Sequence, residues 1–181
     1  MTRRRRQQQA ARAFSLDDYR ANPAQFIAEI LIDPETRAPF QLLPAERAFL
    51  NHAFLTDASG RLVYPEQVFS APKKSGKTGF AALHTLTMCL LFGGQYAEGY
   101  CVANDLEQAQ GRVFLAIKRI VESSPELRAI ARVFSDRVEF PITGASIAAL
   151  ASDYAGAAGA NPTISTFDEL WGFGAITPPV G

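Results

Sequence analysis

The chain has 181 residues, of which 48% are hydrophobic, enough to form a single domain around its own apolar core. Lysine and arginine together number 18, as do aspartate and glutamate, so the net charge gives no sign of a nucleic-acid or membrane partner. Two cysteines cannot make a disulfide framework, and the most apolar run, residues 79–92, is shorter than the roughly 20 residues that cross a bilayer. We therefore expect a cytoplasmic protein with two buried thiols, Cys89 and Cys101.

The chain begins with a basic segment. Arginines occupy positions 3–6 and 12, and the segment lacks the large apolar residues that packing requires. Residues 1–13 are therefore predicted to form a disordered, solvated tail. The alternative is a basic arm that contacts DNA phosphates or an acidic partner, because each neutralised phosphate releases counterions. No apolar stretch of the kind found in a secretory signal follows the arginines.

Residues 14–57 carry apolar side chains at helical spacing, in two pieces that are interrupted by Pro34 and Pro39. Proline removes a backbone donor and clashes with the preceding turn, so the two pieces are expected to be separate helical regions. This segment is predicted to be a helical lead-in to the domain that follows.

From residue 58 the pattern changes to short apolar runs that alternate with helical segments, which is typical of an α/β sheet. The sequence "FPITGAS" between the third and fourth runs contains Gly144, a residue that hairpin turns favour. These two strands are therefore predicted to be antiparallel neighbours. The five predicted strands are 67–70, 100–103, 137–140, 146–151 and 163–167.

A helix is predicted between the second and third strands. Asn104 and Glu107 have the spacing of a capping box, which favours a helix that begins at this point. Polar residues at the same place could instead contact nucleic acid. Five apolar residues recur at intervals of three and four, as on the buried face of a helix. They are Leu106, Ala109, Val113, Ile117 and Ile120.

The sequence "VFSAPKKSGKTGF" ends like a Walker A phosphate-binding loop, although Ala71 stands where the usual pattern opens with glycine. In such a loop, backbone N–H groups and the N-terminus of the following helix face the phosphates. Val68 and Phe69 would end the preceding strand, and residues 80–92 would form the helix. The residues expected to bind the nucleotide are Pro72, Lys74, Ser75, Gly76, Lys77 and Thr78.

Side chains of the loop have separate expected roles. Gly76 would let the backbone approach the anion, Lys77 would reach the β and γ phosphates, and Thr78 would give its hydroxyl to Mg²⁺. Two further lysines lie inside the loop. Lys73 is predicted to be a catalytic cation that meets charge developing on the transferred phosphoryl group, and the alternative for Lys73 and Lys74 is a solvated turn.

The sequence "TISTFDELWGF" places two carboxylates at the end of an apolar strand, where ligands of open α/β sheets collect. As in a Walker B motif, Asp168 would hold Mg²⁺ and Glu169 would act as the general base that activates water. A solvated strand end is the alternative. The upstream phosphate-binding loop favours the catalytic interpretation, because the two motifs predict each other.

Together, the motifs of residues 39–173 resemble the large terminase subunit of tailed bacteriophages, the ATP-driven motor that packages DNA into capsids. The resemblance identifies the chain as the N-terminal ATPase portion of such a subunit, with ATP and Mg²⁺ as cofactors. The matching stretches occur in the family's order. They are "FQLLPAERAFLNHAF", "VFSAPKKSGKT", "YCVANDLEQAQGRVFLAIKRIVESSPEL" and "GANPTISTFDELWGF".

The resemblance implies an α/β P-loop NTPase fold of the additional-strand type, with a mostly parallel sheet flanked by helices. In that fold, a later strand separates the strand of the phosphate loop from the strand of the acidic pair. Residues 58–181 would then be an incomplete ATPase core that ends before this strand. The C-terminal nuclease domain of the family would be absent.

Two positions depart from the family's pattern. Lys73 stands where the family commonly has an arginine thought to act as a finger in cis, and lysine lacks the planar, bidentate guanidinium group. Glu46 stands where the family has a glutamine that contacts adenine.

The resemblance also implies partners and a location. These are double-stranded DNA, a portal protein, the small terminase subunit and further copies of the chain in a ring, in the cytoplasm of a bacterial host. Two alternatives are a helicase-like DNA translocase, which would need a second domain of the same kind, and a non-catalytic prophage remnant.

Overall fold

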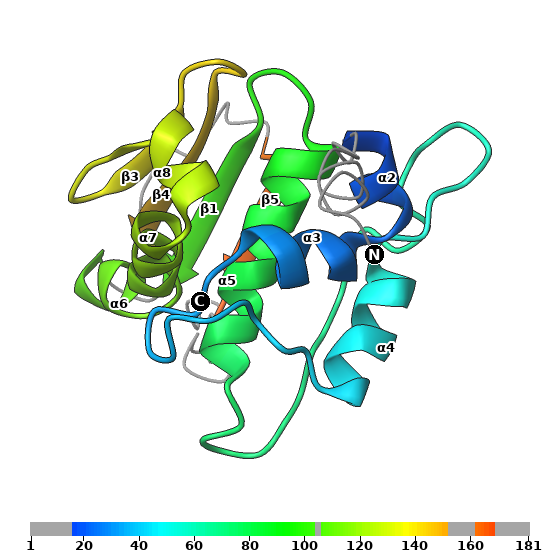
Figure 1. Cartoon of the computed structure of the whole chain (residues 1–181), viewed down its shortest axis with the longest axis horizontal. Helices are drawn as coiled ribbons and strands as arrows, with labels where there is room; N and C mark the ends of the chain where they lie inside the picture. The colour runs from blue at the N-terminus through cyan, green and yellow to red at the C-terminus, as the bar shows by residue number, and fades with distance from the viewer. Residues whose placement is uncertain (1–15, 104–105, 152–161, 169–181) are drawn as a thin grey trace, which may run out of the picture.

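A five-stranded mixed β-sheet forms the centre of the structure, a computed structural model that describes residues 16–103, 106–151 and 162–168 (Figure 1). The strand order is β2-β3-β4-β1-β5. Strand β1 lies between β4 and β5 and pairs in parallel with both, whereas β3 is antiparallel to both of its neighbours, so four strands run in one direction. This confirms the α/β class. The strands are β1 (Glu98–Ala103), β2 (Arg132–Val133), β3 (Arg137–Phe140), β4 (Ala145–Ala151) and β5 (Ile164–Phe167).

Strand β1 is covered so closely on one face that only glycine fits at its second position. A Cβ added at Gly99 would lie 2.7 Å from the Sγ of Cys89, which belongs to the helical segment above the strand. Cys89 and Cys101 are both buried free thiols, which confirms their prediction from the sequence. The register places Cys101 between Ala149 of β4 and Thr166 of β5.

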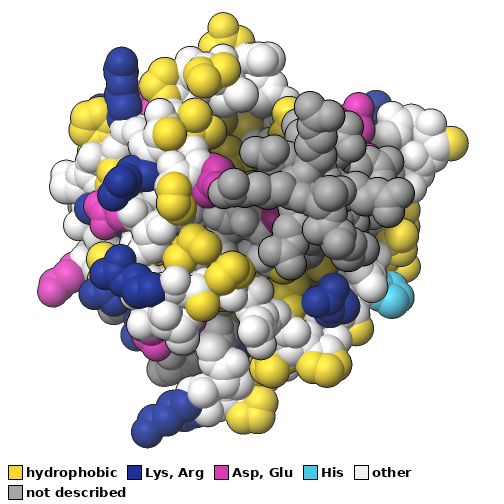
Figure 2. All heavy atoms as spheres, in the orientation of Figure 1, with side chains coloured by type: hydrophobic (Ala, Val, Ile, Leu, Met, Phe, Trp, Pro, Cys, Tyr) yellow, Lys and Arg dark blue, Asp and Glu magenta, His cyan; other side chains and the backbone are white. Residues whose placement is uncertain are grey.

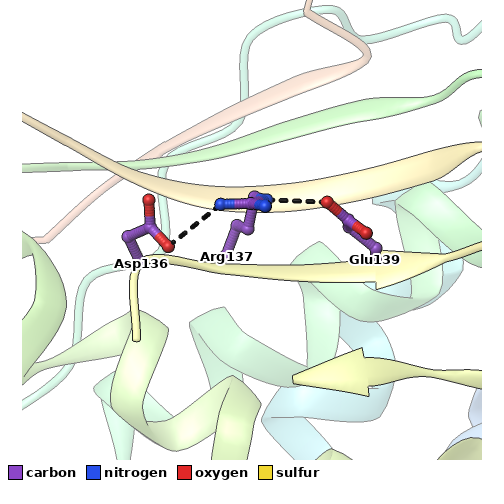
Figure 3. Close-up of polar contacts among 3 residues, drawn as sticks. All are labelled: Asp136, Arg137 and Glu139. Atoms are coloured by element: carbon purple, nitrogen blue, oxygen red, sulfur yellow. Dashed lines mark hydrogen bonds and ion pairs between the residues drawn. The ribbon is translucent and has the colours of Figure 1, made fainter. Parts of the chain in front are cut away.

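The predicted hairpin between β3 and β4 is confirmed. Val138 pairs with Ile147 across the two strands, and Gly144 in the turn has a φ of 71°, in the left-handed region that glycine adopts without strain. On β3, Arg137 donates hydrogen bonds to Glu139 (2.7 Å) and Asp136 (3.3 Å), as Figure 3 shows. These contacts raise the pKa of Arg137. Its positive charge is therefore paired with the carboxylates of Glu139 and Asp136, which are close to it in sequence.

Two helices pack side by side over the front face of the sheet in Figure 1, α5 (Lys77–Thr87) and α7 (Val113–Ser123). Helix α5 continues as a π-helical segment, η1 (Met88–Phe92), so the predicted helix at 80–92 is confirmed, although it begins three residues earlier. Leu86 of α5 and Ile117 of α7 are fully buried. Their burial against the sheet forms the core that holds the end of α5 in place.

The helix predicted across 106–120 is two helices, α6 (Leu106–Gly111) and α7, so the prediction of one continuous helix is wrong. Arg112 interrupts them with φ −119° and ψ −101°, outside the helical region. Gly111 precedes the break, and glycine is among the weakest helix formers. Apolar spacing continues across the break because Ala109 and Val113 are both buried. The proposed cap, Asn104, lies outside the described residues.

The lead-in is helical, with α2 (Leu16–Ala21) and α3 (Pro23–Ile30) before the prolines and α4 (Pro44–Ala53) after them. An additional break falls before Pro23. The backbone N–H of Ile32 donates to the hydroxyl of Ser124, at the junction between α7 and α8 (Pro125–Ile130), over 2.9 Å. The lead-in is thus fastened to the core. Within the described part of the chain, no helix is long and apolar enough to cross a membrane.

The segment before the loop, residues 67–70, is irregular, so the strand predicted there is wrong. Val68 is 80% exposed, and the segment is held instead by Phe69, whose ring packs against Phe49 (5.2 Å) and Phe80 (4.6 Å between centroids). A strand needs a neighbour for its backbone hydrogen bonds. Among the described residues, no strand lies beyond β5 to provide one. The basic tail, residues 1–13, lies outside the described residues.

Candidate functional site

The loop formed by residues 71–78 passes around the N-terminus of α5. Gly76 is the N-cap residue of the helix and has a φ of 83°, and Lys74 also has a positive φ of 63°. These left-handed residues turn the chain so that it enters the helix at Lys77. Successive backbone N–H groups in such a turn, with the helix N-terminus, form an anion-binding concavity. The loop therefore has the backbone form that phosphate binding requires.

Lys77 closes the loop. Its ammonium group donates hydrogen bonds to the carbonyl oxygens of Ala71 and Pro72, each over 2.9 Å. Position 71 contributes only a backbone carbonyl to this contact, and its φ is not among the positive values. A glycine is therefore not needed there, which explains why Ala71 is compatible with the loop.

Ser75 carries a polar atom without a partner. Its hydroxyl oxygen is shielded from solvent and makes no hydrogen bond within the described part of the chain. Buried polar atoms of native proteins are usually hydrogen-bonded, so an orphaned hydroxyl calls for a ligand or water. It lies between Lys74 and Gly76, inside the loop, where an anion would supply the missing partner.

Thr78 and Asp168 come together at the end of the sheet. The Thr78 hydroxyl donates to Oδ2 of Asp168 over 3.1 Å, and both side chains are half-buried. Asp168 follows β5 at its carboxyl end, as predicted. The described residues contain no group of three or more His, Cys, Asp or Glu side chains that could hold a metal ion. Mg²⁺ bound with phosphates usually needs only one or two protein carboxylates, so this oxygen pair fits it. Glu169 lies outside the described residues.

A second hydroxyl contact, which no sequence pattern indicates, fixes β5 against α5. The hydroxyls of Thr85 and Thr166 lie 2.7 Å apart. Thr85 donates its proton to the carbonyl of Ala81 over 2.8 Å, so Thr166 is the donor between the two hydroxyls. Thr166 is two residues before Asp168, and Thr85 is two helical turns after Thr78. The contact therefore sets how the strand end meets the loop.

A cavity of about 880 Å³ opens beside the loop. It is bordered by Gly76 of the loop and Thr78 of α5, by the turn 33–43, by Glu46 of α4 and by α7. Its size is that of a small-molecule site. Oε2 of Glu46 accepts a hydrogen bond from the backbone N–H of Leu43 over 2.8 Å, so one carboxylate oxygen caps its own helix.

Basic residues around the site differ in position. Pro72, Lys73 and Lys74 are exposed on the outer turn of the loop and do not border the cavity. The basic residues that border the cavity are Arg37, Arg112 and Arg119. Figure 2 shows lysine and arginine side chains along the side of the molecule that carries α6, α7 and α8. Sequence reasoning did not single out these arginines, because Arg112 and Arg119 lie in a predicted helix and Arg37 lies in the lead-in, all distant in sequence from the loop and from the acidic pair.

Behind the loop, an aromatic group supports α5. His84 stacks on Phe54 at 4.9 Å and meets Phe49 edge-on at 6.0 Å. Burial lowers the pKa of His84 from 6.5 to about 4, and burial raises the pKa of Cys89 to about 12. The His84 ring is packed against Phe49 and Phe54 and the Cys89 thiol is buried, so neither side chain is placed to meet a substrate. Both residues support the packing of the site.

The chain is similar to known proteins in sequence and in structure. Residues 54–176 match the family model described as "Terminase large subunit, ATPase domain". The solved structure titled "Crystal structure of the HK97 bacteriophage large terminase" matches with a TM-score of 0.66 and 22% identity, over 83% of this chain and 31% of that chain. This chain thus spans about a third of that protein's length. No curated protein sequence matched the chain.

Proposed function

The chain belongs to the family of terminase large subunit ATPase domains, and from this we propose that its loop binds and hydrolyses ATP to drive double-stranded DNA into a phage capsid. The observation that carries the proposal is the hydrogen bond between Thr78 and Asp168. It joins the helix after the loop to the acidic strand end across 90 residues of sequence. Both halves of a nucleoside-triphosphatase site thus meet at one place.

In this proposal, the phosphates lie against the backbone of the loop. Gly76 gives close access to the backbone N–H groups, and the Ser75 hydroxyl gains the partner that it lacks. The ammonium of Lys77 exchanges the carbonyl oxygens of Ala71 and Pro72 for oxygens of the β and γ phosphates. This exchange replaces neutral acceptors with charged ones, and charge-assisted hydrogen bonds are the stronger kind.

Thr78 and Asp168 would hold Mg²⁺ by their side-chain oxygens. The metal ion neutralises charge on the phosphates when it is bound. The contact between Thr85 and Thr166 fixes the position of β5 along α5. It thereby holds the carboxylate of Asp168 near the hydroxyl of Thr78. Glu169, one residue later, would accept the proton of the attacking water. Lys73, on the exposed turn, would need to move toward the phosphate to act there.

The base and ribose would occupy the 880 Å³ cavity beside the loop. One oxygen of Glu46 is engaged by Leu43, which leaves the other to accept a hydrogen bond from an amino group of the base. A carboxylate cannot also donate to a ring nitrogen, as an amide would. The proposed site therefore recognises adenine through fewer hydrogen bonds than a glutamine would provide.

Packaging by the whole protein requires parts and partners beyond this domain. The proposed partners are double-stranded DNA, a portal protein, the small terminase subunit and further copies of the chain in a ring, in the cytoplasm of a host bacterium. The family match favours this motor over a helicase-like translocase.

The test is to titrate the chain with a fluorescent ATP analogue and Mg²⁺ and to measure phosphate release, beside the Lys77→Ala variant. We expect binding by the parent chain and a loss of roughly tenfold or more in affinity for Lys77→Ala, since a charge-assisted contact to phosphate is removed. Equal affinity of both proteins, or no binding by either, would refute the proposed site.

A further inference from the structure

Arg112 occupies a position that no other described residue shares. It borders the 880 Å³ cavity together with Gly76 and Thr78. It also borders a second cavity, of about 10 Å³, together with Thr166 and Asp168. No other described residue lines both cavities. Arg112 therefore shares one cavity with Thr78 and another with Asp168, the two partners of the hydrogen bond at which the metal ion is proposed to bind.

The fold holds this position firmly. Arg112 lies in the break between α6 and α7, where the backbone leaves the helical conformation. The neighbouring Val113 is buried, as is Ala109 one turn earlier, so the two helices fix the break against the sheet. The Arg112 side chain itself is half-buried. A break in a helix next to a cavity is a suitable place from which a long side chain can reach into the site.

Other cations near the loop are less well placed. The Lys77 ammonium is directed to the carbonyls of the loop, and Lys73 is exposed and borders neither cavity. Arg37 and Arg119 border the large cavity, but not the small one beside Asp168. Of the described cations, Arg112 is thus the one next to the metal end of the site.

We infer that Arg112 is a further catalytic residue, whose guanidinium group binds the terminal phosphate of the nucleotide and stabilises the charge that develops on it. The inference rests on the proposed function, since it needs a nucleoside triphosphate in the loop. Guanidinium is always charged at neutral pH and can donate two parallel hydrogen bonds to a phosphate. Such a donor, fixed before the reaction, lowers the energy of the transition state for phosphoryl transfer.

The inference assigns to Arg112 the planar guanidinium group that the lysines of the loop lack. Lys73 stands where related motors commonly have an arginine, and it faces solvent here. An arginine from the break before α7 would supply the planar group from another direction.

A merely structural role for Arg112 would affect the binding of nucleoside diphosphate and triphosphate alike, because a fold defect does not distinguish the two ligands.

The test measures dissociation constants with Mg²⁺ for ADP and for a non-hydrolysable ATP analogue, in the full chain and in three variants. The variants are Arg112→Gln, Arg112→Lys and, as the matched control, Arg128→Gln, at an exposed arginine of α8 that borders neither cavity. We expect Arg112→Gln to reduce the preference for the triphosphate by about tenfold or more, because one charge-assisted contact to the terminal phosphate is lost. Arg112→Lys should reduce it by less, and Arg128→Gln should leave it unchanged.

The ratio of the two constants within one protein cancels any loss of folded material. If Arg112→Gln folds poorly, Arg112→Lys still carries the test, since lysine keeps the stem and charge but loses the bidentate geometry. An unchanged ratio in both Arg112 variants, with normal binding by the parent chain, would overturn the inference and leave the proposed function standing. Failure of the parent chain to bind either nucleotide would overturn both.

Discussion

The hydroxyl of Thr78 donates a hydrogen bond of 3.1 Å to the carboxylate of Asp168, although 90 residues separate them in the chain. Thr78 is the second residue of α5, the helix that follows the loop, and Asp168 follows the edge strand β5. The contact therefore depends on the whole path of the chain between them, through β1, α7 and β4. It brings the loop and the acidic strand end, two motifs that are each local in sequence, together in one candidate site.

Asp168→Asn tests the metal end of this pair. The amide oxygen of asparagine can still accept from Thr78, so we expect little change in stability, but the charge that attracts Mg²⁺ is lost. The gain in nucleotide affinity on adding Mg²⁺ should fall roughly tenfold. Titrations with and without Mg²⁺ measure it. Asp136→Asn, at an exposed carboxylate beside Arg137, is the control and should behave as the parent does. An unaltered Mg²⁺ effect in Asp168→Asn would rule out this metal ligand.

Gly76→Ala tests the left-handed turn of the loop. The space around Gly76 is open, so the cost is that of placing a side chain at a φ of 83°, about 1 kcal/mol of unfolding free energy. Gly79→Ala is a matched control, because Gly79 lies within α5, has open space and lacks a positive φ. It should stabilise the protein by about 1 kcal/mol. Urea unfolding measures the unfolding free energy of both variants. Equal changes in Gly76→Ala and Gly79→Ala would show that the positive φ of Gly76 is not the cause of the loss.

Thr166→Val tests the second contact between β5 and α5. Valine keeps the shape but removes the donor to Thr85, so we expect a loss of about 1 kcal/mol of unfolding free energy. Asp168 should also lose part of its Mg²⁺ affinity, because its strand is less firmly held.

A double-mutant cycle separates this contact from general packing. Thr85→Val and Thr166→Val should be non-additive, since they remove the same interaction. Thr87→Val is the control because the buried Thr87 hydroxyl donates only within its helix, to Leu83. It should destabilise the protein but add independently to Thr166→Val. Full additivity of Thr85→Val with Thr166→Val would show that the two hydroxyls do not stabilise each other.

His84 predicts a dependence of stability on pH. Burial lowers its pKa from 6.5 to about 4 in the folded chain, so between these values the unfolded chain binds more protons. Stability should therefore fall as the pH decreases from 6.5 toward 4, and the His84 contribution should be constant below that range. His84→Phe, which keeps a ring against Phe54, should flatten this part of the curve. Unfolding at a series of pH values measures it, with the exposed His52→Asn as the control.

Short-range patterns predicted much of the fold. The hairpin followed from Gly144 between two apolar runs, and the helix after the loop followed from the apolar spacing beyond Lys77. Asp168 was placed correctly at a strand end, because apolar residues followed by a carboxylate mark the carboxyl end of a buried strand. These features depend on residues that are close in sequence.

Features that depend on distant residues were mispredicted or missed. Val68 and Phe69 have the composition of a strand, but a strand exists only where a neighbour pairs with it. The break at Arg112 leaves the apolar spacing on both sides intact, so periodicity cannot reveal it. The contact between Thr85 and Thr166 joins two elements through side chains that are unremarkable in sequence.

The tether from Lys77 to Ala71 and Pro72 has a kinetic consequence. The two hydrogen bonds hold the loop in its curved form, so the entropy of ordering those residues is lost during folding rather than during association. We expect entry of the nucleotide to be limited by diffusion into the cavity rather than by a slow closure of the loop. Release of the phosphate, in contrast, can begin as soon as the Lys77 ammonium returns to the carbonyl oxygens of Ala71 and Pro72. These oxygens compete with the phosphate for the hydrogen bonds of Lys77.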